Sequence, residues 1–311
     1  MPFGLRKHRD ITLKCHTYFK QRRFNPSKIL PRVNFQSLQL RLDAEALIAA
    51  TDAGARAVGV RGKIPLPSIT NKIANVDRRT GVVELRRTVG VDGAKEIAAA
   101  LGEHRDLKEV RFFGKSEMGI EGAYSIAHAL RYNTHLVKLD LTYAALGDDA
   151  AATIARCLRT NHFLKVLTLF DNVITDTGAA RLAELLKYNQ SLQQLMLGSN
   201  RIGDAGAKFL ADALLENGTL TILKLDFNRL TDAGVTHLAR ALSVNGARAE
   251  LDLLAASLSD SAHEFAEVGA LLELNVASNR FSDYGAIALA NMLFHNCRLE
   301  VCDNLLVLLL L

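Results

Sequence analysis

The chain has 311 residues, of which 49% are hydrophobic and 23% are charged. A chain this long and this apolar can bury a large core, which excludes an intrinsically disordered protein over most of its length. The formal net charge is +5, but residues 1–35 hold nine Lys or Arg against the single acid Asp10, which leaves 29 basic and 32 acidic residues in the rest of the chain.

Residues 1–35 are predicted to form a basic N-terminal arm, in which Tyr18, Phe19 and Phe24 lie among the cations. This composition suits contact with nucleic-acid phosphates or an anionic surface. It also suits a mitochondrial presequence, and a solvated tail is the third interpretation. Residues 36–79 are predicted to form a helical cap followed by an irregular connection.

From about residue 80 the sequence repeats itself with a period of 28 residues. The pattern LxxLxLxxNxL begins at Leu107, Leu136, Leu164, Leu192, Leu220, Arg248 and Leu271, with a weaker unit from Thr80 and a truncated one from Leu299. About eight units therefore span residues 80–311. The unit at Arg248 has only 23 residues and carries Ala256 at the Asn position, so a local kink or opening is expected there.

Each unit combines the signals of a short strand and a helix. Leu167 and Leu169 alternate with Thr168, which indicates a strand with one buried face. A carboxylate recurs where a helix start would offer free N–H groups, and an amide recurs where a helix would end in the left-handed conformation. These residues are Asp148, Asp176, Asp204, Asp232, Asp260 and Asp283, and Asn133, Asn161, Asn189, Asn217, Asn245 and Asn296.

Stacking is predicted because one unit cannot bury its strand and its helix alone. The strands would then form a parallel sheet with the helices on one side. Four further asparagines, Asn172, Asn200, Asn228 and Asn279, are expected to hydrogen-bond the backbone of adjacent loops.

The pattern LxxLxLxxNxLxDxGxxxLAxxLxxN, clean in residues 164–247, resembles the ribonuclease-inhibitor-like class of leucine-rich repeats. It is also similar to the repeat arrays of NOD-like receptors and of Ran GTPase-activating protein. The resemblance covers about residues 80–304. It implies an α/β solenoid, a curved right-handed horseshoe with a parallel sheet on the concave face and helices on the convex face. It also implies a partner-binding surface rather than one chemistry.

The exposed half of the strands and the strand ends are the predicted partner-binding surface. The candidate residues are Arg86, Arg87, Arg111, Phe113, Lys138, Asp140, Tyr143, Phe170, Asp171, Met196, Lys224, Asp226, Phe227 and Asp252. Phe113, Tyr143 and Phe170 are the preferred anchors, because aromatics anchor protein interfaces. Their packing on one another is the alternative. Cations gather toward the start of the array and acids toward its end, which indicates a charge gradient or a solvated surface.

The sequence contains no convincing catalytic or metal-binding motif. His104–Lys108 reads HRDLK, but Arg111 stands where a kinase catalytic loop needs Asn, and the histidines lack metal-ligand spacing. We therefore predict a non-enzymatic scaffold with no cofactor that binds a protein partner of unknown identity. The alternative is GTPase activation of the Ran type, implied by the resemblance alone, although the array is short and has no acidic C-terminal region.

The cysteines Cys15, Cys157, Cys297 and Cys302 lack both metal-ligand spacing and the density of a disulfide framework, which favours the reducing cytoplasm. No apolar run approaches the 20 or so residues that a transmembrane helix needs. The final residues 305–311, LLVLLLL, are predicted to be part of a truncated unit. A self-association edge and a chain that continues beyond this sequence are the alternatives.

Overall fold

The computed structural model describes residues 81–85, 89–112, 116–258, 271–296, 299 and 301–303. All of them belong to one unit of the chain, Leu66–Leu311. The basic arm (1–35), the helical cap with its connection (36–79) and the apolar end (305–311) lie outside the described residues, and the hypotheses about them stay predictions.

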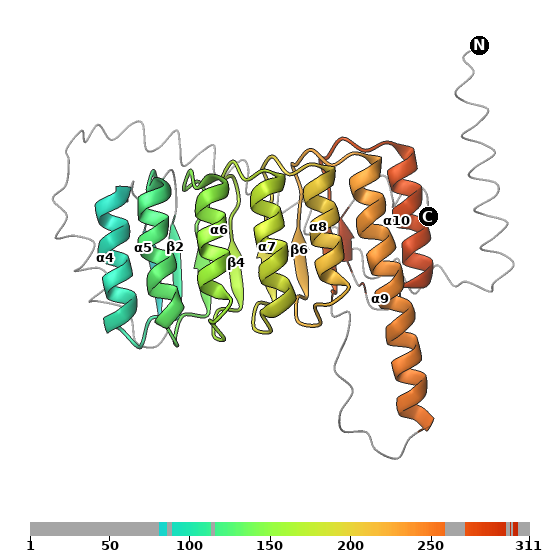
Figure 1. Cartoon of the computed structure of the whole chain (residues 1–311), viewed down its shortest axis with the longest axis horizontal. Helices are drawn as coiled ribbons and strands as arrows, with labels where there is room; N and C mark the ends of the chain where they lie inside the picture. The colour runs from blue at the N-terminus through green and yellow to red at the C-terminus, as the bar shows by residue number, and fades with distance from the viewer. Residues whose placement is uncertain are drawn as a thin grey trace, which may run out of the picture. The chain divides into compact units, whose positions relative to one another are not determined.

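Strands and helices alternate along the described residues, and the strands pair in sequence order as one parallel sheet of eight. The helices lie side by side along one side of this sheet (Figure 1). The order is β1 (Val82–Leu85), α4 (Gly90–Glu103), β2 (Glu109–Phe112), α5 (Gly119–Tyr132), β3 (Lys138–Asp140), α6 (Gly147–Leu158), β4 (Val166–Thr168), α7 (Asp176–Tyr188), β5 (Gln194–Met196), α8 (Asp204–Leu214), β6 (Ile222–Lys224), α9 (Asp232–Leu258), β7 (Glu273–Asn275), α10 (Asp283–His295) and β8 (Val301–Asp303). The predicted α/β solenoid is confirmed.

The core is a stack of inward leucines between the sheet and the helices. In each strand from β3 to β7 one leucine pairs with the next in register and is completely buried, at Leu139, Leu167, Leu195, Leu223 and Leu274. Full burial of a leucine contributes about 1.5–3 kcal/mol. Because each leucine is covered by its neighbours in the adjacent units, the stability of a unit depends on the units beside it.

The repeated aspartates serve helix starts as predicted, but the helix served belongs to the next unit. Asp176 Oδ1 accepts the N–H groups of Gly203 and Gly206, at 2.6 and 3.0 Å, at the start of α8. A Cβ at Gly206 would lie 2.7 Å from the same oxygen. Glycine is therefore required at this position of the repeat, because any side chain would separate the carboxylate from the helix that it caps.

The left-handed conformation predicted for the asparagines after the helices is wrong where the structure describes it. Asn133, Asn189 and Asn296 have φ angles of −75°, −84° and −109°. These residues are selected for their side chains, which are buried. Asn189 Nδ2 donates to Leu158 O of the preceding unit at 2.8 Å, and its Oδ1 accepts from Leu192 N at 2.8 Å.

The predicted ladder of loop asparagines is confirmed. Asn200 Oδ1 accepts the backbone N–H groups of Asn172 and Ile174 at 3.0 and 2.9 Å, and its Nδ2 donates to Leu169 O at 2.9 Å. Asn172, Asn228 and Asn279 make equivalent bonds. The ladder thus fixes each loop to its neighbour at the carboxyl ends of the strands.

The unit predicted at Arg248 is wrong, because residues 248–256 contain no strand. Helix α9 runs for 27 residues, Asp232–Leu258, and projects past its neighbours in Figure 1. Strand β6 pairs directly with β7, Leu223 opposite Leu274, so the sheet does not open between them. The alternation in AELDL suggested a strand, but Ala, Glu, Leu and Arg are strong helix formers, and Ala256 cannot supply the ladder amide. Asp252 therefore lies in a helix.

Candidate functional site

The outward side of the sheet carries two rows of half-buried side chains, which we call the strand face. They occupy the first and third positions of β1 to β6, on either side of a buried residue, and the first position of β7. Described members are Glu84, Glu109, Arg111, Lys138, Asp140, Val166, Thr168, Gln194, Met196, Ile222, Lys224 and Glu273. The structure thus places the predicted Arg111, Lys138, Asp140, Met196 and Lys224 on this face.

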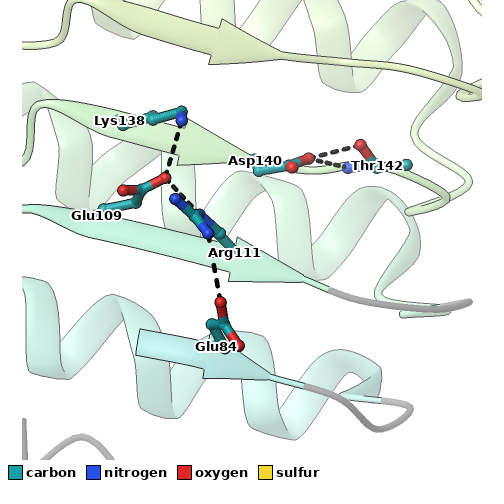
Figure 2. A network of polar contacts seen from close by, with 6 residues as sticks. All are labelled: Glu84, Glu109, Arg111, Lys138, Asp140 and Thr142. Carbon is teal, nitrogen blue, oxygen red and sulfur yellow. Dashed lines mark hydrogen bonds and ion pairs between the residues drawn. The ribbon is translucent and has the colours of Figure 1, made fainter. Parts of the chain in front are cut away.

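The end of the strand face on β1–β3 is a connected ionic network (Figure 2). Glu109 accepts a hydrogen bond from Arg111 Nε and forms an ion pair with Lys138 Nζ at 3.0 Å. Arg111 also reaches Glu84 at 3.3 Å. Next to them, Asp140 accepts from the backbone N–H of Thr142 at 3.0 Å and from its hydroxyl.

The pairing in this network is reflected in the pKa values. Burial would raise the pKa of Glu109, but hydrogen bonds and charges from Arg111 and Lys138 outweigh it and lower this pKa below its ordinary value. The hydrogen bond to Glu109 raises the pKa of Arg111. Lys224 is likewise paired with Glu273 at 2.8 Å. The predicted cations that the structure describes on the strand face, Arg111, Lys138 and Lys224, are therefore neutralised within it.

Between these ion pairs the strand face is uncharged. Strands β4, β5 and β6 contribute Val166, Thr168, Gln194, Met196 and Ile222, all half-buried. A partner that covers this middle section would bury side chains without first separating an ion pair.

A row of residues in the left-handed conformation follows the strands. Its members occupy the same position of five units, at Tyr143, Asp171, Ser199, Phe227 and Ser278, with φ between 52° and 57°. This conformation is uncommon for bulky side chains. Here the backbone is held by the next unit, since Tyr143 N donates to Phe170 O at 3.1 Å and Phe227 N to Ala277 O at 3.0 Å.

Aromatic side chains dominate this edge. We call Tyr143, Phe170, Asp171, Asp226 and Phe227 the ledge. Tyr143 packs edge-on against Phe170, with ring centroids 6.1 Å apart, yet remains 42% exposed, and Phe227 is 54% exposed. Burial raises the pKa of Tyr143, with a contribution from the negative charge of Asp171. The two predicted roles of the aromatics, mutual packing and exposure, therefore coexist.

One glycine makes room for the ledge. A Cβ at Gly198 would lie 2.9 Å from the Phe170 ring and 2.8 Å from Asp226 Oδ1. The position of the Phe170 ring therefore depends on the absence of a side chain in the neighbouring unit.

Three predicted site residues, Arg86, Arg87 and Phe113, lie outside the described residues, and Asp252 lies in α9. Sequence reasoning missed a row of exposed arginines, Arg201, Arg229 and Arg280. The sequence contains a signal for this row. In three successive units the ladder asparagine is followed directly by an arginine and an apolar residue, as NRI, NRL and NRF.

In the part of the chain that the structure describes, no group of three or more His, Cys, Asp or Glu side chains could hold a metal ion. No helix within the same residues has the length and apolar character needed to span a membrane.

The fold and the strand face together define a β–α repeat solenoid. A family model described as Leucine Rich repeat matches residues 132–155, 160–183, 188–211, 216–239 and 271–290. The chain is a leucine-rich repeat protein of the ribonuclease-inhibitor-like class.

Among the solved structures that resemble the chain are one of leiomodin-1 and one of a tropomodulin. The structure named Leiomodin-1 Actin-Binding Site 2 is 19% identical, covers 57% of this chain and 88% of its own, and has a TM-score of 0.43. The Caenorhabditis elegans tropomodulin C-terminal domain is 23% identical, covers 52% of this chain and 98% of its own, and has a TM-score of 0.43. No curated protein matches the chain.

Proposed function

We propose that the protein is a non-enzymatic scaffold that binds a partner protein across the middle of the strand face and the ledge. One observation carries the proposal: Tyr143 and Phe227 are large, exposed side chains held in the left-handed conformation by backbone hydrogen bonds to the next unit. Backbone conformations that are rare for a residue type concentrate at functional sites.

The energetics of the surface favour binding by these residues. A Tyr or Phe presents a large contact area with few rotatable bonds, so it loses little conformational entropy when a partner covers it. The backbone of the ledge is already fixed by the ladder around Asn172 and Asn200. A partner would thus meet a pre-organised surface, and binding energy would not be spent on ordering loops.

The test is affinity capture followed by quantitative mass spectrometry, with the wild type and two double variants as baits. Y143A/F227A removes both aromatic anchors of the ledge. Y132A/Y284A removes two tyrosines that are 68% and 78% exposed on α5 and α10, and serves as the matched control. We expect proteins captured by the wild type and by the control to be lost with Y143A/F227A. Equal capture by both variants would refute the proposal.

We also propose a cytoplasmic location. Cys157 forms no disulfide with any residue that the structure describes, which suits a reducing compartment. A fluorescent fusion of the full chain tests the location, and an organelle-restricted signal would contradict it. Targeting or anion binding by residues 1–35 and self-association through residues 305–311 remain predictions, because both segments lie outside the described residues.

A further inference from the structure

We infer that Arg201, Arg229 and Arg280 form an arginine row that binds the carboxylates of an acidic segment of the partner protein. The inference deepens the proposed function and rests on it, because it specifies the chemistry of the partner that binds at the loops following the strands. It goes beyond the predicted site, which contains none of these three residues.

The repeat places the three arginines in equivalent positions of adjacent units. Each backbone N–H donates to a carbonyl of the unit before, from Arg201 to Ile174, from Arg229 to Ile202 and from Arg280 to Leu230, at 2.8 Å in every case. Neighbouring strands of a sheet lie about 4.8 Å apart, so the three side chains start from backbone positions spaced at about this interval. The insertion after β6 does not interrupt the row, because β6 pairs directly with β7.

The arginine row differs from the cations of the strand face. Arg201, Arg229 and Arg280 are exposed, and none has an ion pair with any other residue that the structure describes. Arg111, Lys138 and Lys224, in contrast, each have an acidic partner.

The nearby carboxylates are already engaged. Asp204 accepts from Thr231 N at 2.7 Å and Gly234 N at 2.9 Å. Asp232 accepts from the Ser282 hydroxyl at 2.7 Å, from Ser282 N at 2.7 Å and from Gly285 N at 2.8 Å, and these bonds, that of the hydroxyl most of all, lower its pKa. The three arginines therefore follow one another in adjacent units while Asp204 and Asp232 cap helices, which leaves the guanidinium groups available to a ligand.

Carboxylates fit the row better than a nucleic-acid backbone does. The planar guanidinium group pairs with a carboxylate through two parallel hydrogen bonds. Residues 36–311 carry 29 basic against 32 acidic side chains, a charge balance that does not favour nucleic-acid binding.

Fluorescence anisotropy tests the inference on the full chain, with a labelled ten-residue glutamate peptide as probe. The variant R201E/R229E/R280E reverses the row, and R105E/K208E/R240E is the matched control, which reverses three exposed cations elsewhere with the same change of net charge. We expect the row variant to bind the peptide at least tenfold more weakly than wild type, and the control to stay within threefold. The variant R201Q/R229Q/R280Q removes the same contacts without charge reversal and should also bind the peptide more weakly. It replaces R201E/R229E/R280E if that variant fails to fold.

Three outcomes overturn the inference. Equal weakening by the row and control variants would show that net charge attracts the peptide, and unchanged binding by both would assign the peptide to another part of the chain, such as residues 1–35. A ten-nucleotide oligothymidylate that binds the row more tightly than the peptide would assign it to phosphates. None of these results depends on the aromatic anchors. Capture that survives Y143A/F227A refutes the proposed function, whereas peptide binding that survives the arginine variants refutes only the arginine row.

Discussion

The ladder asparagine Asn200 gives the sharpest test of how the array is held together. Its side chain is 7% exposed and lies between Ser199 of the left-handed row and Arg201 of the arginine row. We expect Asn200→Ala to destabilise the protein and to weaken binding at this edge, because the same amide fixes the loops of two units.

The magnitude follows from the hydrogen bonds that the substitution removes. Asn200 Oδ1 is an acceptor for the N–H groups of Asn172 and Ile174, both of which are completely buried residues. Each buried group left without a partner costs about 1–3 kcal/mol. Two such groups give about 2–6 kcal/mol, and entry of water into the space left by the amide would bring the loss toward the lower end.

Urea unfolding followed by far-UV circular dichroism measures this loss. Asn291→Ala is the control, because Asn291 is exposed on α10 and its replacement should change the free energy of unfolding by no more than about 0.5 kcal/mol. If Asn200→Ala fell within about 1 kcal/mol of this control, the buried amide would not be holding adjacent units together, and the ladder account would be refuted.

Three further predictions address the ledge, the ionic network and the insertion. Gly198→Ala should displace the Phe170 ring and weaken partner capture about tenfold, whereas Gly102→Ala, which meets no atom within 4 Å, should not. Because the folded pKa of Glu109 is lowered, its stabilising effect is present above the unfolded carboxyl pKa of about 4.3 and is lost as pH falls through the lower folded value. Urea unfolding at a series of pH values should therefore show the free energy of unfolding of the wild type falling in acid, and a smaller fall in Glu109→Gln. Deletion of residues 248–270 should leave the melting temperature within about 4 °C of wild type or raise it. The deletion restores the 28-residue spacing and offers N–H partners to the buried Asn245 Oδ1, which has none in the described part of the chain. A larger decrease in melting temperature would mean that the insertion stabilises the array.

The fold and much of the candidate site could be predicted from the sequence, because equivalent positions of the repeat show which residues are buried and which face outward. A leucine that recurs every 28 residues defines the buried position, so the alternation along each strand assigns its neighbours Lys138, Met196 and Lys224 to the outward face. Tyr143 was predicted as a bulky residue at a position where the core does not need it, and Phe227 as an outward residue beside its strand; both are exposed. The arginine row could have been found from its recurring NR dipeptides.

The sequence by itself determined the repeat, the order of strands and helices and the inward leucines, because these depend on periodicities within single units. Only the tertiary structure decided which contacts link the units. It paired Glu109 with Arg111 and Lys138, assigned each aspartate to the helix of the next unit, and joined β6 to β7 while residues 248–258 continued α9 as a helix. The physical reason is that ion pairs and strand pairing form between residues distant in sequence, whereas short segments such as AELDL suit a strand or a helix equally well until their neighbours are in place.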